Sequence, residues 1–163
     1  SYAGGDNAGT ARLQYPTASR LIRTMCSGRV DEKFIMHAFK LGAPMVLVSG
    51  CHFADCHYIN AVHWTQKRMD RIWNRLDKLG IRVDRLQLEW ISAAEGEKVK
   101  RVVNEMVETL TRLGPLGIPQ KFDEWDREME HFAEHVAARE AAAAGGGRAE
   151  ASAQTQTMET AHA

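Results

Sequence analysis

The apolar positions of the chain alternate between short continuous runs and longer stretches in which they recur every three or four residues. The runs at 44–50 and 86–91 are short and bounded by turn signals, which predicts β-strands. The segment at 20–25 is partly β-branched and predicts a further strand. The run at 44–50 is apolar almost throughout, so we expect it to be buried on both faces, as strands of parallel sheets are.

Three longer segments carry their apolar residues on one helical stripe, which predicts helices over about 31–41, 59–79 and 92–113. Each segment is followed by a glycine, and Asp31 stands where the first helix needs its N-cap. The expected buried faces are Phe34, Ile35, Ala38, Phe39 and Leu41 in the first helix, Val62, Thr65, Met69, Ile72, Trp73, Leu76 and Leu79 in the second, and Val99, Val102, Val103, Met106, Leu110 and Leu113 in the third.

Strands and helices therefore alternate along the chain, which is typical of an α/β domain with a parallel sheet and helices on its faces. We expect a small flavodoxin-like, doubly wound domain over residues 1–118. The first sixteen residues include Gly4, Gly5 and Gly9 and are expected to form a loop. Because three strands make a small sheet, we expect its first strand to lie upstream of Ser1.

The pattern changes after Pro119. Apolar residues at helical spacing predict one more amphipathic helix over 119–140, which either packs on its own domain or grips a partner. Residues 141–163 are a low-complexity stretch rich in alanine and glycine, which predicts a disordered tail. The apolar face of the helix consists of Phe122, Trp125, Met129, Phe132 and Val136.

Composition narrows the class of protein. The 163 residues include 21 Lys and Arg and 21 Asp and Glu, so the net charge is zero and gives no sign of nucleic-acid binding. No run of eighteen apolar residues predicts a membrane span, and the N-terminal stretch does not resemble a signal peptide. The three cysteines are an odd number and do not indicate a disulfide framework. We therefore expect a reduced, cytoplasmic protein.

The cysteines lie where chemistry is expected in such a fold. Cys26 follows the strand predicted at 20–25, and Cys51 and Cys56 follow the strand at 44–50 within the stretch "GCHFADCHYIN". The carboxyl ends of parallel strands share one edge of a sheet, where ligands bind. We therefore expect the three thiols to converge. The dipoles of helices that start nearby would favour their thiolate forms.

Residue types alone leave three kinds of site open at these cysteines. An iron–sulfur cluster needs four ligands, generally thiolates. Zinc would also need a fourth ligand, which His52 or His57 could supply. A redox pair would use only Cys51 and Cys56, although their spacing is wider than in most thiol oxidoreductases. We interpret the histidines as partners of the sulfur ligands more than as ligands themselves.

No catalytic motif accompanies the cysteines. The stretch "GGDNAG" does not follow a predicted strand, so it is not a dinucleotide-binding fingerprint. The chain also lacks H-E-x-x-H, an EF-hand loop and a Ser-His-Asp order. We therefore expect no chemistry on a substrate by this chain alone.

Three motifs, "MCSGRVD", "VLVSGCHFADCHYINA" and "LEWISAAEGEKV", resemble the delta subunit family of methyl-viologen-reducing hydrogenase. "SYAGGDNAG" and "RLQYP" fit the N-terminal part of the family, so the resemblance covers about 1–115. It implies a small cytoplasmic iron–sulfur protein with a 2Fe–2S cluster. Such a protein passes electrons between a hydrogenase or formate dehydrogenase and a heterodisulfide-reductase-type flavoprotein. Cys26, Cys51 and Cys56 match the cluster-binding cysteines of the family.

The family pattern also differs from this chain at one end. Family members place a strand and a C-x-x-C pair, in "CNWCSYAG", directly before the residues that correspond to "SYAG". The resemblance therefore implies that the fourth cluster ligand and the first strand both lie upstream of Ser1, in a segment cut from this chain. It implies nothing about the C-terminal helix or the tail.

Overall fold

A computed structural model describes residues 1–117 and 122–159 of the protein. The chain divides into two compact units, Ser1–Pro119 and Gln120–Ala163. The first unit is an α/β domain, and the described residues of the second form one helix. This confirms the predicted α/β class with an additional C-terminal helix.

The sheet of the domain consists of two parallel strands. Strand β1 covers Val46–Gly50 and β2 covers Leu86–Trp90, with Val46 opposite Leu86 and Gly50 opposite Trp90. Both strands agree with the apolar runs in the sequence, and their parallel pairing agrees with the βα alternation. A helix lies in the crossover between them.

The strand predicted at 20–25 is wrong. Within the described residues the sheet has only β1 and β2, and segment 20–25 runs as irregular chain. Ile22 and Met25 expose most of their surface. A strand exists through its hydrogen bonds to a neighbouring strand, and this segment pairs with none. Its β-branched residues therefore do not form a strand, because the described part of the chain offers no strand with which the segment pairs.

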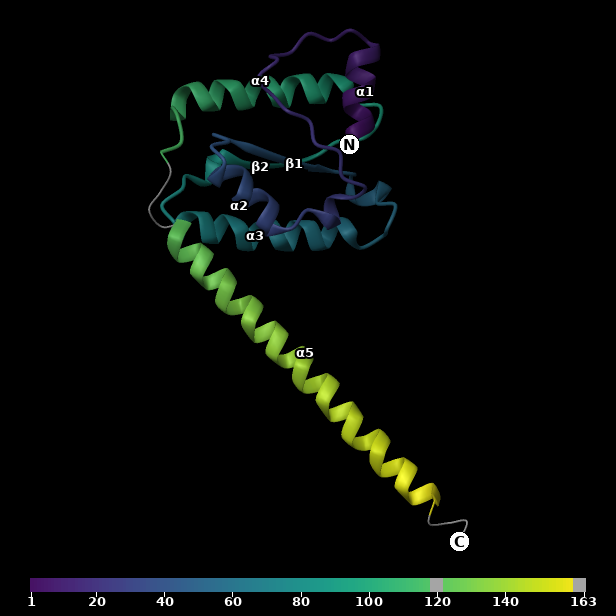
Figure 1. Ribbon diagram of the computed structural model, residues 1–163. Coiled ribbons are helices and arrows are strands. Elements are labelled where there is room, and N and C mark those ends of the chain that lie inside the picture. The colour runs from purple at the N-terminus through teal and green to yellow at the C-terminus, as the bar shows by residue number, and fades with distance from the viewer. Residues whose placement is uncertain (118–121, 160–163) are drawn as a thin grey trace. The chain divides into compact units, whose positions relative to one another are not determined.

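Helices cover both faces of the sheet (Figure 1). α4, at Gly96–Leu113, lies over one face, and α1, at Tyr2–Thr10, lies beside its N-terminal end. α2, at Glu32–Lys40, and α3, at Ala61–Lys78, lie on the opposite face. The domain is therefore a three-layer sandwich with its core between the sheet and each helical layer.

The helix boundaries follow the signals in the sequence. The Asp31 side chain accepts a hydrogen bond of 3.0 Å from the Lys33 backbone N–H, which caps α2. Gly42, Gly80 and Gly114 follow α2, α3 and α4 with φ of +94°, +73° and +70°, positive values that glycine adopts readily and that are common where helices end. Helix termination is thus explained by local chemistry alone.

The buried faces of the helices agree with the predicted stripes at most positions. On α3 the side chains of Val62, Thr65, Met69, Ile72 and Leu76 are buried. On α2 the stripe is displaced, because Phe34 and Leu41 are exposed whereas Ile35, Met36 and Phe39 are buried. The predicted stripe was wrong by about one position at its edge, as expected when a short helix has apolar residues on more than one side.

The loop expected over the first sixteen residues is also wrong over 2–10, which form α1. A Cβ at Gly4 would lie 2.8 Å from the Ser92 carbonyl oxygen, so glycine permits α1 to approach the end of β2 closely. Ala8 packs with Ile91, Val99 and Val103 in one buried cluster. Burial against α4 therefore stabilises α1, although the glycines of this segment have low helix propensity.

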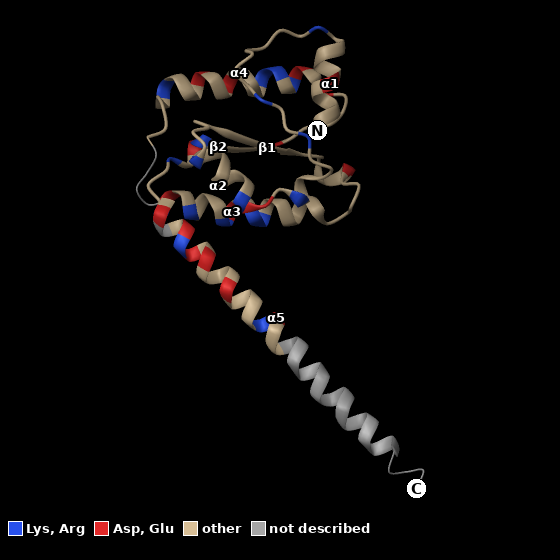
Figure 2. Ribbon diagram, viewed as in Figure 1, with Lys and Arg blue, Asp and Glu red and all other residues tan. Residues whose placement is uncertain are grey.

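The second unit contains α5, at Phe122–Glu159. Acidic residues predominate in its first turns, whereas α4 carries charges of both signs (Figure 2). The presence of this helix agrees with the amphipathic helix predicted over 119–140, whose apolar face begins at Phe122. Two further expectations stay predictions: the boundaries at 118–119 and 140–141, and the disorder of 141–163. Residues 118–121 and 160–163 lie outside the described part of the chain. None of the described helices combines the length and apolar character of a membrane span.

Candidate functional site

The three cysteines lie in two segments of the α/β domain. Cys51 directly follows β1, and Cys56 follows a short 3₁₀ helix, η2, at Phe53–Asp55. Cys26 is the N-cap residue of a second 3₁₀ helix, η1, at Ser27–Arg29. All three are half-buried and free of disulfides. Each thiol is thus partly shielded from water and available for chemistry.

The two segments meet at the carboxyl end of β1. A Cβ added to Gly50 would lie 2.6 Å from Ser27 Oγ and 2.8 Å from the Trp90 ring. Because such distances are too short for real atoms, η1 lies directly against the last residue of the strand. The residues that follow Cys26 and precede Cys51 are therefore in contact, although they are far apart in sequence.

Three contacts hold the Cys26 segment against α3. Ser27 Oγ lies 3.1 Å from Thr65 Oγ1, and both residues are buried. Arg68 donates from Nη1 to the carbonyl oxygens of Gly28 and Val30, at 3.0 and 2.7 Å. Within the segment, the Gly28 N–H donates to Cys26 Sγ at 3.3 Å. A backbone donor of this kind stabilises a thiolate or a metal-bound sulfur.

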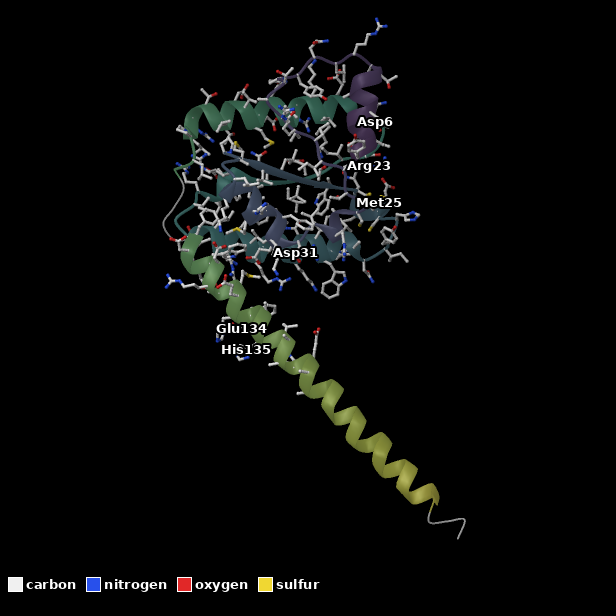
Figure 3. The ribbon with its side chains drawn as sticks, in the orientation of Figure 1. Asp6, Arg23, Met25, Asp31, Glu134 and His135 are labelled. Carbon is white, nitrogen blue, oxygen red and sulfur yellow. The ribbon has the colours of Figure 1, made fainter. Side chains whose placement is uncertain are left out.

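The chain between α1 and Cys26 passes along the same end of the domain. Figure 3 labels Arg23 and Met25 of this segment on the same side of the domain as Asp6 of α1. The Arg23 guanidinium lies 5.4 Å from the centroid of the Tyr2 ring, which is cation–π distance. This contact links the approach to Cys26 with the first turn of α1.

The loop with Cys51 and Cys56 is linked to the start of α4 through His52. Its Nε2 lies 2.6 Å from Glu95 Oε2, and the same oxygen accepts a hydrogen bond of 2.6 Å from the Ser92 N–H. The Ser92 N–H, and after it the His52 ring, hold the pKa of the Glu95 carboxyl below its ordinary value. The carboxylate therefore accepts and the imidazole N–H donates. His57, by contrast, is exposed and contacts the Tyr58 ring.

Aromatic side chains surround this loop. The Phe53 ring packs edge-on against Trp90 and His63, with centroids 5.0 and 4.9 Å away. Trp64 is mostly exposed, with Lys67 Nζ 5.0 Å from its ring centroid. The cysteine edge thus carries aromatic surface that water reaches.

Backbone strain accompanies Cys56. Ile59 has φ of +58°, a left-handed conformation that is rare for a β-branched residue. Its N–H donates to the Cys56 carbonyl at 3.0 Å, which closes the turn before α3. Because its side chain is 77% exposed, burial offsets little of the strain. The chain therefore carries a local conformational cost in the turn that follows this cysteine.

Replacing Ile59 with asparagine is expected to raise the free energy of unfolding by about 1 kcal/mol, because asparagine tolerates this conformation better. Ile22→Asn is the matched control, since Ile22 is 85% exposed and is not among the described residues with positive φ. Urea denaturation followed by circular dichroism measures both. Equal midpoints for the two variants would show that the backbone at Ile59 stores no strain.

A 2Fe–2S cluster is compatible with the chemistry of the cysteine segments, which supply free thiols, partial burial and a backbone donor. Over 1–117 and 122–159, however, no three His, Cys, Asp or Glu side chains are arranged to hold a metal ion. The assignment of Cys26, Cys51 and Cys56 as ligands, and of His52 and His57 as their partners or as alternative ligands, therefore stays a prediction.

An open cavity of about 700 Å³ lies elsewhere, along β2 between α3 and α4. Trp73, Asp77, Glu89 and Arg112 are among its lining residues. The lining includes neither a cysteine nor a histidine, so the cavity offers no thiol or imidazole chemistry. The cysteine edge remains the candidate site.

Sequence reasoning missed the residues that support the cysteines. Glu95 stands one residue before α4 and after the end of β2, a position at which a side chain can reach the next loop. An acidic residue between a predicted strand and the following helix was therefore the signal that could have indicated this contact. Ser27, Thr65 and Arg68 gave no comparable signal, because their contacts join segments 38 to 40 residues apart.

The chain is similar to known proteins over the whole α/β domain. Residues 1–114 match the family model described as methyl-viologen-reducing hydrogenase, delta subunit. An iron–sulfur subunit of the vhc F420-non-reducing hydrogenase of Methanococcus voltae is 43% identical over 127 residues, which are 76% of this chain and 88% of the relative. The corresponding iron–sulfur subunit of the F420-non-reducing hydrogenase of Archaeoglobus profundus is 41% identical over 71% of this chain and 84% of its own length.

A third relative is much longer than this chain. It is a subunit of the ferredoxin/F420H2-dependent CoB-CoM heterodisulfide reductase of Methanosarcina acetivorans. This relative is 46% identical over 72% of the present chain, but the match spans only 15% of the relative. The family match alone covers well over half of the present chain. The chain therefore belongs to the methyl-viologen-reducing hydrogenase delta subunit family.

Proposed function

We propose that the protein is an electron-transfer subunit that carries a 2Fe–2S cluster on Cys26, Cys51 and Cys56. The observation that supports this best is the contact between the two cysteine segments at the carboxyl end of β1, through Ser27 and Gly50. Thiolates are the usual ligands of such clusters, and a four-thiolate cluster needs one ligand beyond these three. The names of the two hydrogenase relatives, both iron–sulfur subunits, agree with this cofactor.

The residues of the chain would hold the cluster and shield it in part. When bound, a 2Fe–2S cluster supplies a one-electron redox couple. The Gly28 N–H donates toward Cys26 Sγ, and hydrogen bonds to cluster sulfurs are one of the factors that set a reduction potential. The exposed aromatic surface at Trp64 would let a partner approach closely. No residue of this edge needs to act as a general base.

The proposed partners are a hydrogenase or formate dehydrogenase on one side and a heterodisulfide-reductase-type flavoprotein on the other. The relatives from Methanococcus voltae and Archaeoglobus profundus are named as hydrogenase subunits. In heterodisulfide reductase chains of two Methanosarcina species, a similar segment is part of the longer chain. Proteins that are joined in one chain in some organisms commonly work in contact, which supports the second partner.

The cofactor is tested on the protein purified without oxygen. Iron and sulfide in equal amounts, a visible absorption band and an EPR signal on reduction are expected. Cys51→Ser is expected to remove most of the bound iron, because cluster ligands act together. His57→Gln is the control and should keep the iron, since the His57 ring is exposed and the proposed ligands are the three cysteines. Stoichiometric zinc, without iron or redox activity, would contradict the proposal.

A further inference from the structure

The loop that carries Cys51 and Cys56 has few links to the rest of the domain. Its backbone hydrogen bonds to other described residues stay within the loop or join it to the first turn of α3. Among the described residues, the hydrogen bond from His52 to Glu95 is the one side-chain hydrogen bond between residues 51–60 and another element. Phe53 adds ring contacts with Trp90 and His63. The position of the loop therefore depends strongly on one carboxylate.

Glu95 is well suited to fix that position. One of its oxygens accepts from both His52 Nε2 and the Ser92 N–H, each at 2.6 Å. The Glu95 backbone N–H also donates to the Ser92 carbonyl oxygen at 3.2 Å. The next residue, Gly96, lies so close to α1 that an added Cβ would be 2.8 Å from the Ala8 nitrogen. Glu95 is thus held by the backbone on both sides.

We propose that Glu95 is a positioning residue that acts through His52. The two side chains form a clamp, His52–Glu95, which holds the Cys51–Cys56 loop at the carboxyl end of the sheet beside the Cys26 segment. Neither side chain needs to touch a cofactor for this role. The value of the clamp for electron transfer rests on the proposed function, but its existence can be tested on the metal-free protein.

Thiol reactivity measures the clamp directly. In the reduced, metal-free protein, His52→Ala is expected to raise the alkylation rates of Cys51 and Cys56 by iodoacetamide about tenfold, because one charge-assisted hydrogen bond is lost. Cys26 is the internal reference and should keep its rate, because Ser27 and Arg68 hold its segment separately. Peptide mass spectrometry separates the three cysteines.

Conservative variants distinguish positioning from general loss of structure. His52→Gln keeps a donor and Glu95→Gln keeps an acceptor, so both should return the rates close to those of the original protein. The double variant of His52→Ala with Glu95→Ala should react no faster than Glu95→Ala alone, since the two act as one unit. Glu97→Ala is the control on α4, because Glu97 is mostly exposed and pairs only loosely with Lys100.

The outcomes separate the clamp from the proposed function. Faster alkylation of Cys51 and Cys56 in His52→Ala, with rescue by glutamine, supports the clamp whether or not the protein binds iron. Unchanged rates in His52→Ala, or equal acceleration of Cys26, overturn it even in a protein that carries a cluster. In the iron-loaded protein, His52→Ala should also broaden the EPR signal, whereas His52→Gln should not.

Discussion

Replacing Arg85 with methionine is expected to lower the free energy of unfolding by about 3 kcal/mol, because several buried acceptors lose their donor together. Arg85 is only 5% exposed. Its Nη1 donates to the Pro44 carbonyl oxygen at 2.9 Å. Its Nη2 lies 3.0 to 3.2 Å from three further carbonyl oxygens, those of Leu113, Gly114 and Pro115. The guanidinium thus joins the start of β1 to the end of α4.

Urea denaturation of the metal-free protein measures this change. Arg82→Met is the matched control, because Arg82 is exposed and forms its ion pair with the neighbouring Asp84, so its loss should cost less than about 1 kcal/mol. Arg85→Lys should be intermediate, since a lysine keeps the charge but cannot direct donors to acceptors on both sides. Similar unfolding midpoints for Arg85→Met and Arg82→Met would show that the four carbonyl groups find other donors.

A methyl group at position 50 is expected to separate the two cysteine segments. In Gly50→Ala the new Cβ would lie 2.6 Å from Ser27 Oγ and 2.8 Å from a Trp90 ring atom, so η1 must shift. Overpacking of this kind costs about 1–3 kcal/mol of stability. Since Cys26 directly precedes Ser27, its alkylation rate in the metal-free protein should rise. In the anaerobically purified protein, the iron content should fall.

Gly9→Ala is the control for this substitution. An added Cβ at Gly9 meets nothing within 4 Å, and alanine favours the helical conformation of α1. It should therefore leave the alkylation rate and the iron content unchanged and stabilise the protein slightly. If Gly50→Ala behaved like Gly9→Ala in all three measurements, the contact between Ser27 and Gly50 would not position Cys26.

The elements that were predicted correctly are those whose local pattern and tertiary role agree. The stripe of α3 and the apolar run of β1 report burial directly, and the capping aspartate of α2 and the glycines after three helices report helix ends. Segment 20–25 and α1 depend instead on distant partners. The first finds no strand to pair with, and the second forms because Gly4 and Ala8 fit against β2 and α4.

The candidate site shows the same division. The position of Cys51 at the carboxyl end of β1 follows from the apolar run before it and from βα alternation. The segment that follows Cys26 reaches the same edge in another way. Irregular chain, not a strand, precedes Cys26, and contacts with α3 hold the segment in place. The hydrogen bond between His52 and Glu95 joins residues 43 positions apart, and no periodicity relates them. Such contacts become visible only when the crossover is folded.

The docking of α1 also has a consequence for the cooperativity of folding. Asn7 Oδ1 accepts a hydrogen bond of 3.2 Å from the Gly96 N–H, one of the donors that a helix leaves unsatisfied in its first turn. When α1 detaches, α4 therefore loses a cap at the same moment as Ala8 leaves the core. We therefore expect the first ten residues and the beginning of α4, with Glu95, to open together in local unfolding. Detachment of the N-terminal helix is then expected to loosen the hydrogen bond from His52 to Glu95 as well, and with it the loop that carries Cys51 and Cys56.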